Sequence, residues 1–212
     1  QGKIFNSFQI KKAIFKTKIP RLKLIPSTIE LSGVEVELAR EQGREIRLRK
    51  ALDHIMGEFD YILIDCPPAL GILTINAFTA AHSVIVPMQC EFYSLEGLSH
   101  LIHTINRVKK TYNPDLNIRG LVLTMVDKRN SLTDQVANDI KGFFGKKVYK
   151  TTIPRNVRVS EAPSFGKPAL IYDIKCKGSK AYLHLAWGIS GQVSVHWLKP
   201  ATASRCAQAG RV

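Results

Sequence analysis

An apolar run that ends in one carboxylate, followed by two prolines, constrains the fold of this chain more than any other feature. Residues 59–68 read FDYILIDCPP, with Asp65 directly after the apolar run. A continuous apolar run is typical of a buried parallel strand, and the prolines end that strand and turn the chain away. In nucleotide-binding folds such a strand places its carboxylate beside Mg²⁺ or the attacking water. The run therefore predicts one half of a nucleotide site, with Asp65 as its acidic residue.

The other half of such a site is a phosphate loop, and the sequence does not contain one. Its pattern is G-x-x-x-x-G-K-[ST], in which backbone amides and the lysine hold the phosphates and the hydroxyl reaches magnesium. Gly-Lys pairs occur at 2–3, 145–146 and 166–167, and none is followed by Ser or Thr. We therefore expect a P-loop NTPase-like chain whose N-terminal phosphate-loop unit is missing.

Composition narrows the class of protein further. A chain of 212 residues with 45% hydrophobic and 23% charged residues suits one α/β domain, or one domain plus appendages. Four widely spaced cysteines without a C-x-x-C pair indicate reduced thiols in a cytoplasmic protein. No apolar run approaches the roughly 20 residues of a membrane span, so we expect no membrane partner. The net charge of +14 favours a polyanionic partner, unless it is simply a solvated basic surface.

Strand-like and helix-like segments alternate along the chain. We expect strands at 61–64, 83–88, 118–126 and 148–153, and helices at 73–81, 95–108, 132–144 and 179–186, with two further helices within 29–56. This order predicts an α/β fold with a mostly parallel twisted sheet, right-handed crossovers and helices on both faces.

Polar residues follow several of these strands, where such folds bind ligands. They are Asp65, Gln89, Glu91, Asp127, Arg155 and Asn156. One polar residue after a strand occurs by chance in many proteins, since loops are polar anyway. The whole set, with two prolines directly after Asp65, favours a ligand-binding edge of the sheet.

Several motifs occur together in an order that resembles one family. They are DCPP at 65–68, QCE at 89–91, LEGL at 95–98, TMVD at 124–127 and IPRNVRVSEAPS at 153–164, with LIPS at 24–27, ELSG at 30–33 and GRE at 43–45 upstream. Over about residues 14–186 the chain is similar to the ParA/Soj partition ATPases, relatives of MinD in the deviant Walker group.

The resemblance implies a function. Members of the family bind ATP and Mg²⁺, dimerise around the nucleotide, attach to DNA without sequence preference and hydrolyse ATP when a ParB-type partner stimulates them. They segregate chromosomes or plasmids in the cytoplasm, on the nucleoid. A MinD-like positioning ATPase is an alternative, although that group holds the bilayer through a C-terminal amphipathic helix that this tail does not offer.

The resemblance also assigns roles to individual residues. Asp65 corresponds to the Walker B carboxylate and would hold magnesium through water. The other assignments are Gln89 and Glu91 to the dimer and partner switch, Met125, Asp127 and Pro154 to the adenine pocket, and Arg129 and Arg158 to DNA contacts. For Arg158, an ion pair with Glu161 is an equally weighted alternative.

The chain departs from the family pattern at both ends. We expect a basic segment at 1–28, an incomplete ATPase domain at 29–186, and an atypical tail at 187–212, where Gly188 disfavours a helix and which a frameshift would explain. Compared with the family pattern, we expect roughly the first third of a typical member, with its phosphate loop, to be missing. We therefore expect this chain alone to be inactive as an ATPase and poorly soluble, with a non-catalytic DNA-binding module as the alternative function.

Overall fold

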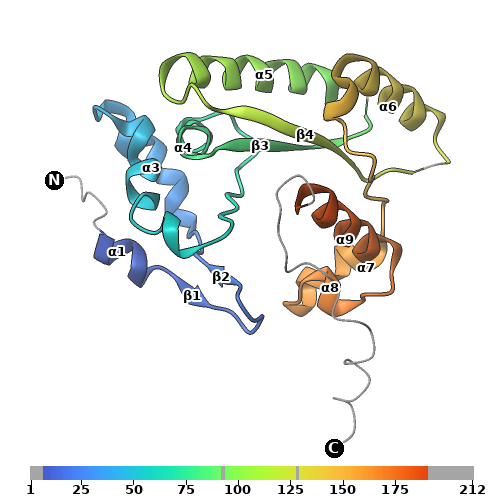
Figure 1. The fold of residues 1–212 in the computed structure, drawn as a ribbon, viewed down its shortest axis with the longest axis horizontal. Helices are drawn as coiled ribbons and strands as arrows, with labels where there is room; N and C mark the ends of the chain where they lie inside the picture. Colours follow the sequence, from blue (N-terminus) through green and yellow to red (C-terminus); the bar gives the residue numbers. More distant parts are fainter. Residues whose placement is uncertain (1–6, 92–93, 128, 191–212) are drawn as a thin grey trace, which may run out of the picture. The chain divides into compact units, whose positions relative to one another are not determined.

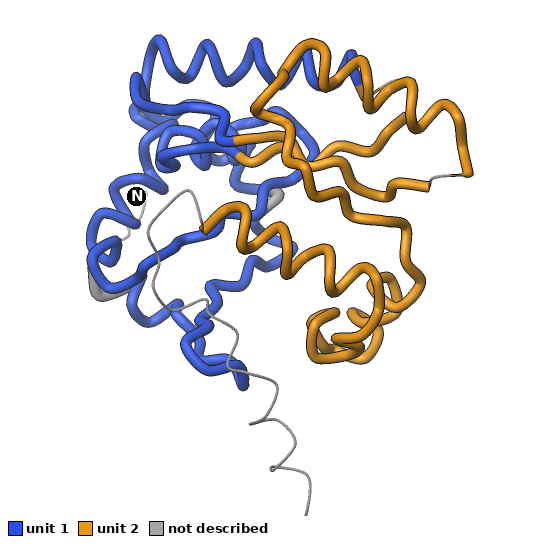
Figure 2. The backbone as a smooth tube through the Cα atoms, turned by 45° about the vertical axis from the view of Figure 1, so that its right-hand side comes forward, with its two compact units in different colours: residues 1–84, 95–119 blue, residues 85–94, 120–212 orange. Residues whose placement is uncertain are grey.

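A computed structural model of the chain describes residues 7–91, 94–127 and 129–190 (Figure 1). The chain forms two compact units, unit 1 of residues 1–84 and 95–119, and unit 2 of residues 85–94 and 120–212 (Figure 2). Parallel strand pairing and alternating helices confirm the expected α/β class.

Unit 1 contains a short antiparallel hairpin, a series of short helical turns and two longer helices. In chain order these are α1 (Ser7–Lys12), β1 (Phe15–Lys16), β2 (Lys23–Leu24), the 3-10 helix η1 (Ile29–Gly33), α2 (Val34–Glu37), η2 (Leu38–Arg40), η3 (Arg44–Ile46), α3 (Arg47–Leu52), η4 (Met56–Glu58), α4 (Ile72–Ala80) and α5 (Ser94–Thr111). The hairpin pairs Phe15 with Leu24. Strands β3 (Ser83–Gln89) and β4 (Asn117–Thr124) pair with each other, and Figure 1 shows their arrows running the same way.

One buried cluster of unit 1 joins α4 to α5 and to the first residues of both strands, and another contains Ala51, Leu52 and Ile55. The buried members of the first cluster are Phe78, Ile105, Val108 and Leu116, with Val84 and Ile118 packed against them. The helical spacing of apolar residues in α5 is the pattern that predicted this helix, and the same residues form its buried face.

Asn113 lies in the connection between α5 and β4 and also caps the end of α4. Its side-chain amide, in a residue only 7% exposed, donates to the carbonyl oxygens of Phe78, Thr79 and Ala81 at 2.9, 3.2 and 2.7 Å. The last carbonyls of a helix have no partner within the helix, so a buried donor at this place satisfies groups that would otherwise be unpaired.

Unit 2 contains the second part of the sheet and the remaining helices. These are α6 (Ser131–Phe144), η5 (Gly145–Lys147), α7 (Val157–Glu161), η6 (Ala162–Phe165), α8 (Ala169–Tyr172) and α9 (Lys177–Ser190). Leu121, Val122 and Leu123 of β4 are all at most 2% exposed. Because successive side chains of a strand point to opposite faces, β4 is covered on both faces, and Leu185 of α9 packs with Val122 on one of them.

The expectation of a buried strand at 61–64 is wrong. The segment is extended but pairs with no strand among the described residues, and Leu63 is 87% exposed. A strand exists only through hydrogen bonds to a neighbour, and the apolar run alone cannot supply one. Asp65 is exposed as a consequence and does not end a sheet strand.

Three other boundaries also differ from expectation. Residues 29–56 form short helical turns that are divided at Gly43, whose φ of +70° is left-handed, rather than two full helices. In place of a continuous strand at 148–153, the chain makes isolated parallel bridges at Val148 and at Pro154. Helix α9 continues through Gly188 to Ser190 because Ile189 packs on the core of unit 2. Residues 191–212 of the expected tail, and 1–6 of the basic segment, lie outside the described residues.

Within residues 7–91, 94–127 and 129–190, no helix combines the length and the apolar character needed to cross a membrane.

Candidate functional site

The carboxyl end of β4 in unit 2 brings together the residues predicted to line an adenine pocket. Val126 forms a parallel bridge with Pro154, in which the Val126 amide donates to Ile153 O at 3.1 Å and the Arg155 amide donates to Val126 O at 3.2 Å. This pairing fixes Met125 and Asp127, which flank Val126, beside Pro154 at one edge of the sheet.

Met125 has an unusual backbone conformation at this edge. Its φ of +53° lies in the left-handed region, which a residue with a Cβ adopts only at a cost of about 1 kcal/mol or more. The side chain is 37% exposed, so burial of the methionine does not explain the conformation. The turn instead ends β4 abruptly and starts the loop that carries Asp127.

Asp127 and Arg129 form a bidentate ion pair. The Arg129 Nε and Nη2 atoms donate to Asp127 Oδ1 and Oδ2 at 3.0 and 2.8 Å, and the Arg129 amide also donates to Oδ1 at 3.1 Å. These hydrogen bonds lower the pKa of Asp127 to about 2 and raise the pKa of Arg129. The sequence placed these two residues in different sites, one for adenine and one for DNA, and the structure pairs them.

Gln89 and Glu91 lie at the end of the neighbouring strand. Gln89 is the last residue of β3, and Thr124 Oγ1 at the end of β4 donates to Met88 O at 3.1 Å. Both Gln89 and Glu91 are exposed. The two strands of unit 2 therefore end together, and the predicted switch residues lie at the same edge of the sheet as Met125.

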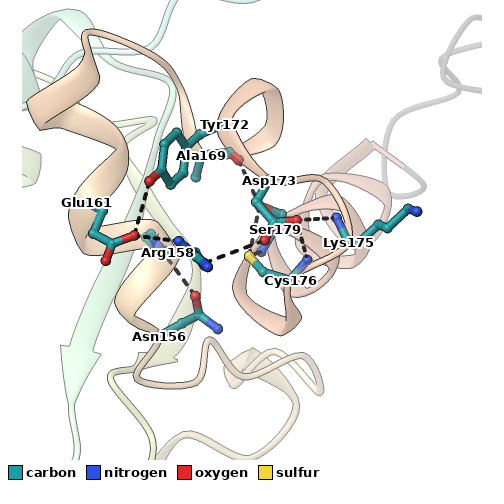
Figure 3. Close-up of polar contacts among 10 residues, drawn as sticks. Asn156, Arg158, Glu161, Ala169, Tyr172, Asp173, Lys175, Cys176 and Ser179 are labelled. Carbon is teal, nitrogen blue, oxygen red and sulfur yellow. Dashed lines mark hydrogen bonds and ion pairs between the residues drawn. The ribbon is translucent and has the colours of Figure 1, made fainter.

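Arg158 lies in a network of polar side chains on α7, α8 and the start of α9 (Figure 3). Its Nη1 donates to Glu161 Oε2 at 3.1 Å, one turn along α7, and its Nε lies 4.0 Å from Asp173 Oδ2. Tyr172 Oη also donates to Glu161 Oε2, at 3.1 Å. The hydrogen bond to Glu161, followed by the contact with Tyr172, raises the pKa of Arg158. The alternative of an ion pair with Glu161 is thus realised in the structure.

Backbone groups fix the surroundings of this network. Asn156 Oδ1 accepts from Val159 N at 3.3 Å and so caps the start of α7. Asp173 Oδ1 accepts from the amides of Lys175 and Cys176 at 2.9 and 3.1 Å. The i, i+3 spacing of Arg158 and Glu161 is visible in the sequence, but nothing in it points to Tyr172 or Asp173, which only the fold brings close.

Asp65 belongs to unit 1, where it lies exposed in the extended segment before the two prolines. Partial burial, and to a lesser extent the charge of Asp65, raises the pKa of the neighbouring Cys66 thiol. No group of three or more His, Cys, Asp or Glu side chains suited to a metal ion occurs in the part of the chain that the structure describes.

The residues present therefore fit a bound nucleotide only in part. For the base of a nucleotide, the sheet edge offers a loop, a proline and the carboxylate of Asp127, although that carboxylate already pairs with Arg129. The phosphate side has no phosphate loop in the sequence, and Asp65 is not held at a strand end.

The fold and this edge define the class of protein as an α/β protein of the P-loop NTPase type. A solved structure supports the class: the cobyrinic acid a,c-diamide synthase of Mycobacterium smegmatis, crystallised with an ATP analogue and magnesium, is 35% identical with a TM-score of 0.70 over 85% of this chain and 69% of that one.

A protein-family model described as an AAA domain matches residues 2–118. The chromosome partitioning protein ParA of Caulobacter vibrioides is 59% identical over 176 residues, which are 82% of this chain and 66% of that protein. The sporulation initiation inhibitor protein Soj of Bacillus subtilis is 54% identical over 170 residues, 80% of this chain and 67% of that protein. The chain belongs to the ParA/Soj family. It spans less than two thirds of the Caulobacter protein's length.

Proposed function

We propose that this chain represents a chromosome- or plasmid-partitioning ATPase that works by ATP-dependent dimerisation and non-specific DNA binding. The observation that carries the proposal is the 59% identity over 176 residues to a protein named for chromosome partitioning. Identity at this level extends over motifs from several elements, and it therefore supports a shared mechanism more strongly than the fold does.

The edge formed by β3, β4 and residues 148–154 is the proposed nucleotide side of the protein. Met125, Asp127 and Pro154 would face the adenine, and Gln89 and Glu91 would report the bound nucleotide to the dimer and partner surface. Asp65 would hold Mg²⁺ through water beside the phosphates. Hydrolysis of the Mg²⁺-bound ATP would supply the energy, and the residues named here would bind and orient the nucleotide.

Arg129 and Arg158 are the proposed DNA contacts. Both are exposed, with 89% and 57% of their side chains accessible. Arginines that contact only phosphates bind DNA with little sequence preference and with strong salt dependence. A monomer has few such contacts, so we propose that a homodimer binds DNA. A ParB-type protein would stimulate ATP hydrolysis and so the release of the DNA. The protein would act on the nucleoid in the cytoplasm.

For the 212-residue chain by itself, we propose that nucleotide binding is lost and DNA binding is retained. The absence of the G-x-x-x-x-G-K-[ST] pattern from the sequence favours this non-catalytic module as the second candidate.

Two titrations of the purified chain separate these functions. A fluorescent ATP analogue with Mg²⁺ measures nucleotide binding, and a labelled 30-base-pair duplex at several salt concentrations measures DNA binding. We expect no micromolar nucleotide binding, and DNA affinity that falls as salt rises. Micromolar ATP binding would contradict the argument from the missing phosphate loop, and the absence of DNA binding at low salt would contradict the roles of Arg129 and Arg158.

A further inference from the structure

Arg158 is surrounded by more negative charge than its own positive charge balances. The guanidinium contributes one positive charge, and Glu161 and Asp173 contribute two negative charges, so the cluster has a net charge of −1. Figure 3 shows the Lys175 side chain extending away from the guanidinium, so it does not offset this charge. A phosphate that approaches Arg158 in this arrangement is repelled by two carboxylates.

We propose that Glu161 and Asp173 hold Arg158 in an intramolecular pair that a nucleic-acid phosphate must displace, so that these carboxylates set the threshold for polyanion binding. The inference rests on the proposed DNA-binding function and adds its regulation. Glu161 and Asp173 act as positioning residues, and Arg158 is the group that contacts phosphate.

The carboxylates are fixed more firmly than the arginine. Tyr172 holds Glu161 through its hydroxyl, and the Tyr172 ring stacks on Phe165 with centroids 5.0 Å apart. Two backbone amides hold Asp173. Arg158, by contrast, is bound through Nη1 and approached at Nε, and 57% of its side chain is exposed. Displacement therefore moves the arginine and leaves the acidic residues in place.

The expected cost of that displacement is small for one pair. Exposed ion pairs contribute little, so releasing Arg158 lowers affinity for one phosphate by about fivefold at most. A single arginine in a monomer cannot recover this cost by itself. Several phosphates contacted together on a duplex recover it, and the paired state therefore favours long polyanions over single phosphates.

The first experiment measures the restraint on Arg158 without DNA. The purified full chain is treated with phenylglyoxal, and modification of Arg158 is followed by peptide mass spectrometry in the wild type and in Glu161→Gln. Glutamine keeps the shape of the side chain and can still pair with Tyr172, so the fold is expected to be retained and is checked by circular dichroism. We expect the modification rate of Arg158 to rise by about fivefold in the variant.

The second experiment measures binding of a 30-base-pair duplex by the same proteins at several salt concentrations. We expect Glu161→Gln to bind up to about fivefold more tightly. Its log–log salt slope should match that of the wild type, because Arg158 contacts a phosphate in both complexes, and a slope steeper by about 0.9 would contradict displacement in the wild type. Asp139→Asn is the matched control, because it removes one negative charge from an exposed position on α6 of the same unit. Arg158→Gln added to Glu161→Gln should abolish the gain.

The outcomes separate this inference from the proposed function. An unchanged Arg158 modification rate in folded Glu161→Gln, or an equal gain of affinity in Asp139→Asn, would overturn the inference. If no variant binds duplex, the DNA-binding function fails. In that case pyrophosphate is the probe, and the measurement is how far it protects Arg158 from phenylglyoxal. Protection in Glu161→Gln but not in the wild type would still support the inference. Equal protection in both proteins, or none in either, would refute the inference.

Discussion

Gly120 in β4 offers the sharpest test of how unit 2 is packed. A Cβ at this position would lie 2.5 Å from Tyr149 Cε2 and 2.9 Å from Lys147 O. Neither neighbour can yield easily, because one is a backbone carbonyl and the other is a ring packed against the cluster of Val122, Ile153 and Leu185. The Tyr149 ring would have to move by about 1 Å to reach ordinary contact distance. Overpacking of this kind costs about 1–3 kcal/mol, and we expect Gly120→Ala to fall in the upper half of that range.

Urea unfolding followed by circular dichroism measures the change, and Gly142→Ala is its control. Gly142 lies inside α6 of the same unit, and an added Cβ there meets nothing within 4 Å. Replacing an open helical glycine should stabilise the protein by about 0.5–1 kcal/mol, so the two substitutions should have opposite signs. A loss below about 0.5 kcal/mol for Gly120→Ala would refute the packing of Tyr149 against β4.

Three further predictions test other parts of the molecule. Asn113→Ala leaves three carbonyls at the end of α4 without their buried donor. We expect the free energy of unfolding, measured in urea, to fall by about 1–3 kcal/mol. A change near zero would contradict the role of Asn113 as a cap. The carboxyl of Asp127 should titrate in NMR near its pKa of about 2, and Arg129→Gln should return it towards 3.8. Because the pKa is lowered in the folded state, the stabilisation from this pair is present above about pH 4 and is lost as the pH falls towards 2; an unperturbed midpoint in the wild type would refute the pair. Leu63→Lys, at an 87% exposed position, should raise the solubility measured by ultracentrifugation while changing unfolding by less than about 0.5 kcal/mol, and a larger loss would show that Leu63 is buried.

Elements with their own periodicity could be predicted from the sequence. The apolar residues of α5 and α6 recur at helical spacing, and their buried faces contain those residues. The apolar run of β4 indicated a strand covered on both faces, as found. In each case the buried face is encoded within the segment itself, so local sequence was sufficient.

Elements that depend on distant partners could not be predicted in this way. The run at 61–64 carries the composition of a strand, but whether a neighbour pairs with it is a tertiary property. Gly188 costs about 1 kcal/mol in a helix, and the packing of Leu185 and Ile189 on the core outweighs it.

The candidate site was predictable to a similar extent. The motifs placed Met125, Asp127 and Pro154 at one sheet edge, and the bridge at Val126 brings them there. The partners of the two arginines were not predicted in full. The motif that contains Asp127 gives no sign of its ion pair with Arg129, because that contact depends on the conformation of the loop after β4. The contribution of Asp173 to the Arg158 network needs the loop between α8 and α9, which sequence spacing does not reveal.

The left-handed backbone of Met125 determines which side chains this position can tolerate. The position directly follows a buried apolar strand, and hydrophobicity alone would favour valine or isoleucine there. Branching at Cβ makes a positive φ especially unfavourable, whereas glycine and asparagine adopt it readily. In a library randomised at position 125 and selected for folding, glycine and asparagine should therefore be enriched and the β-branched residues lost, so backbone geometry rather than apolar character decides what this strand end accepts.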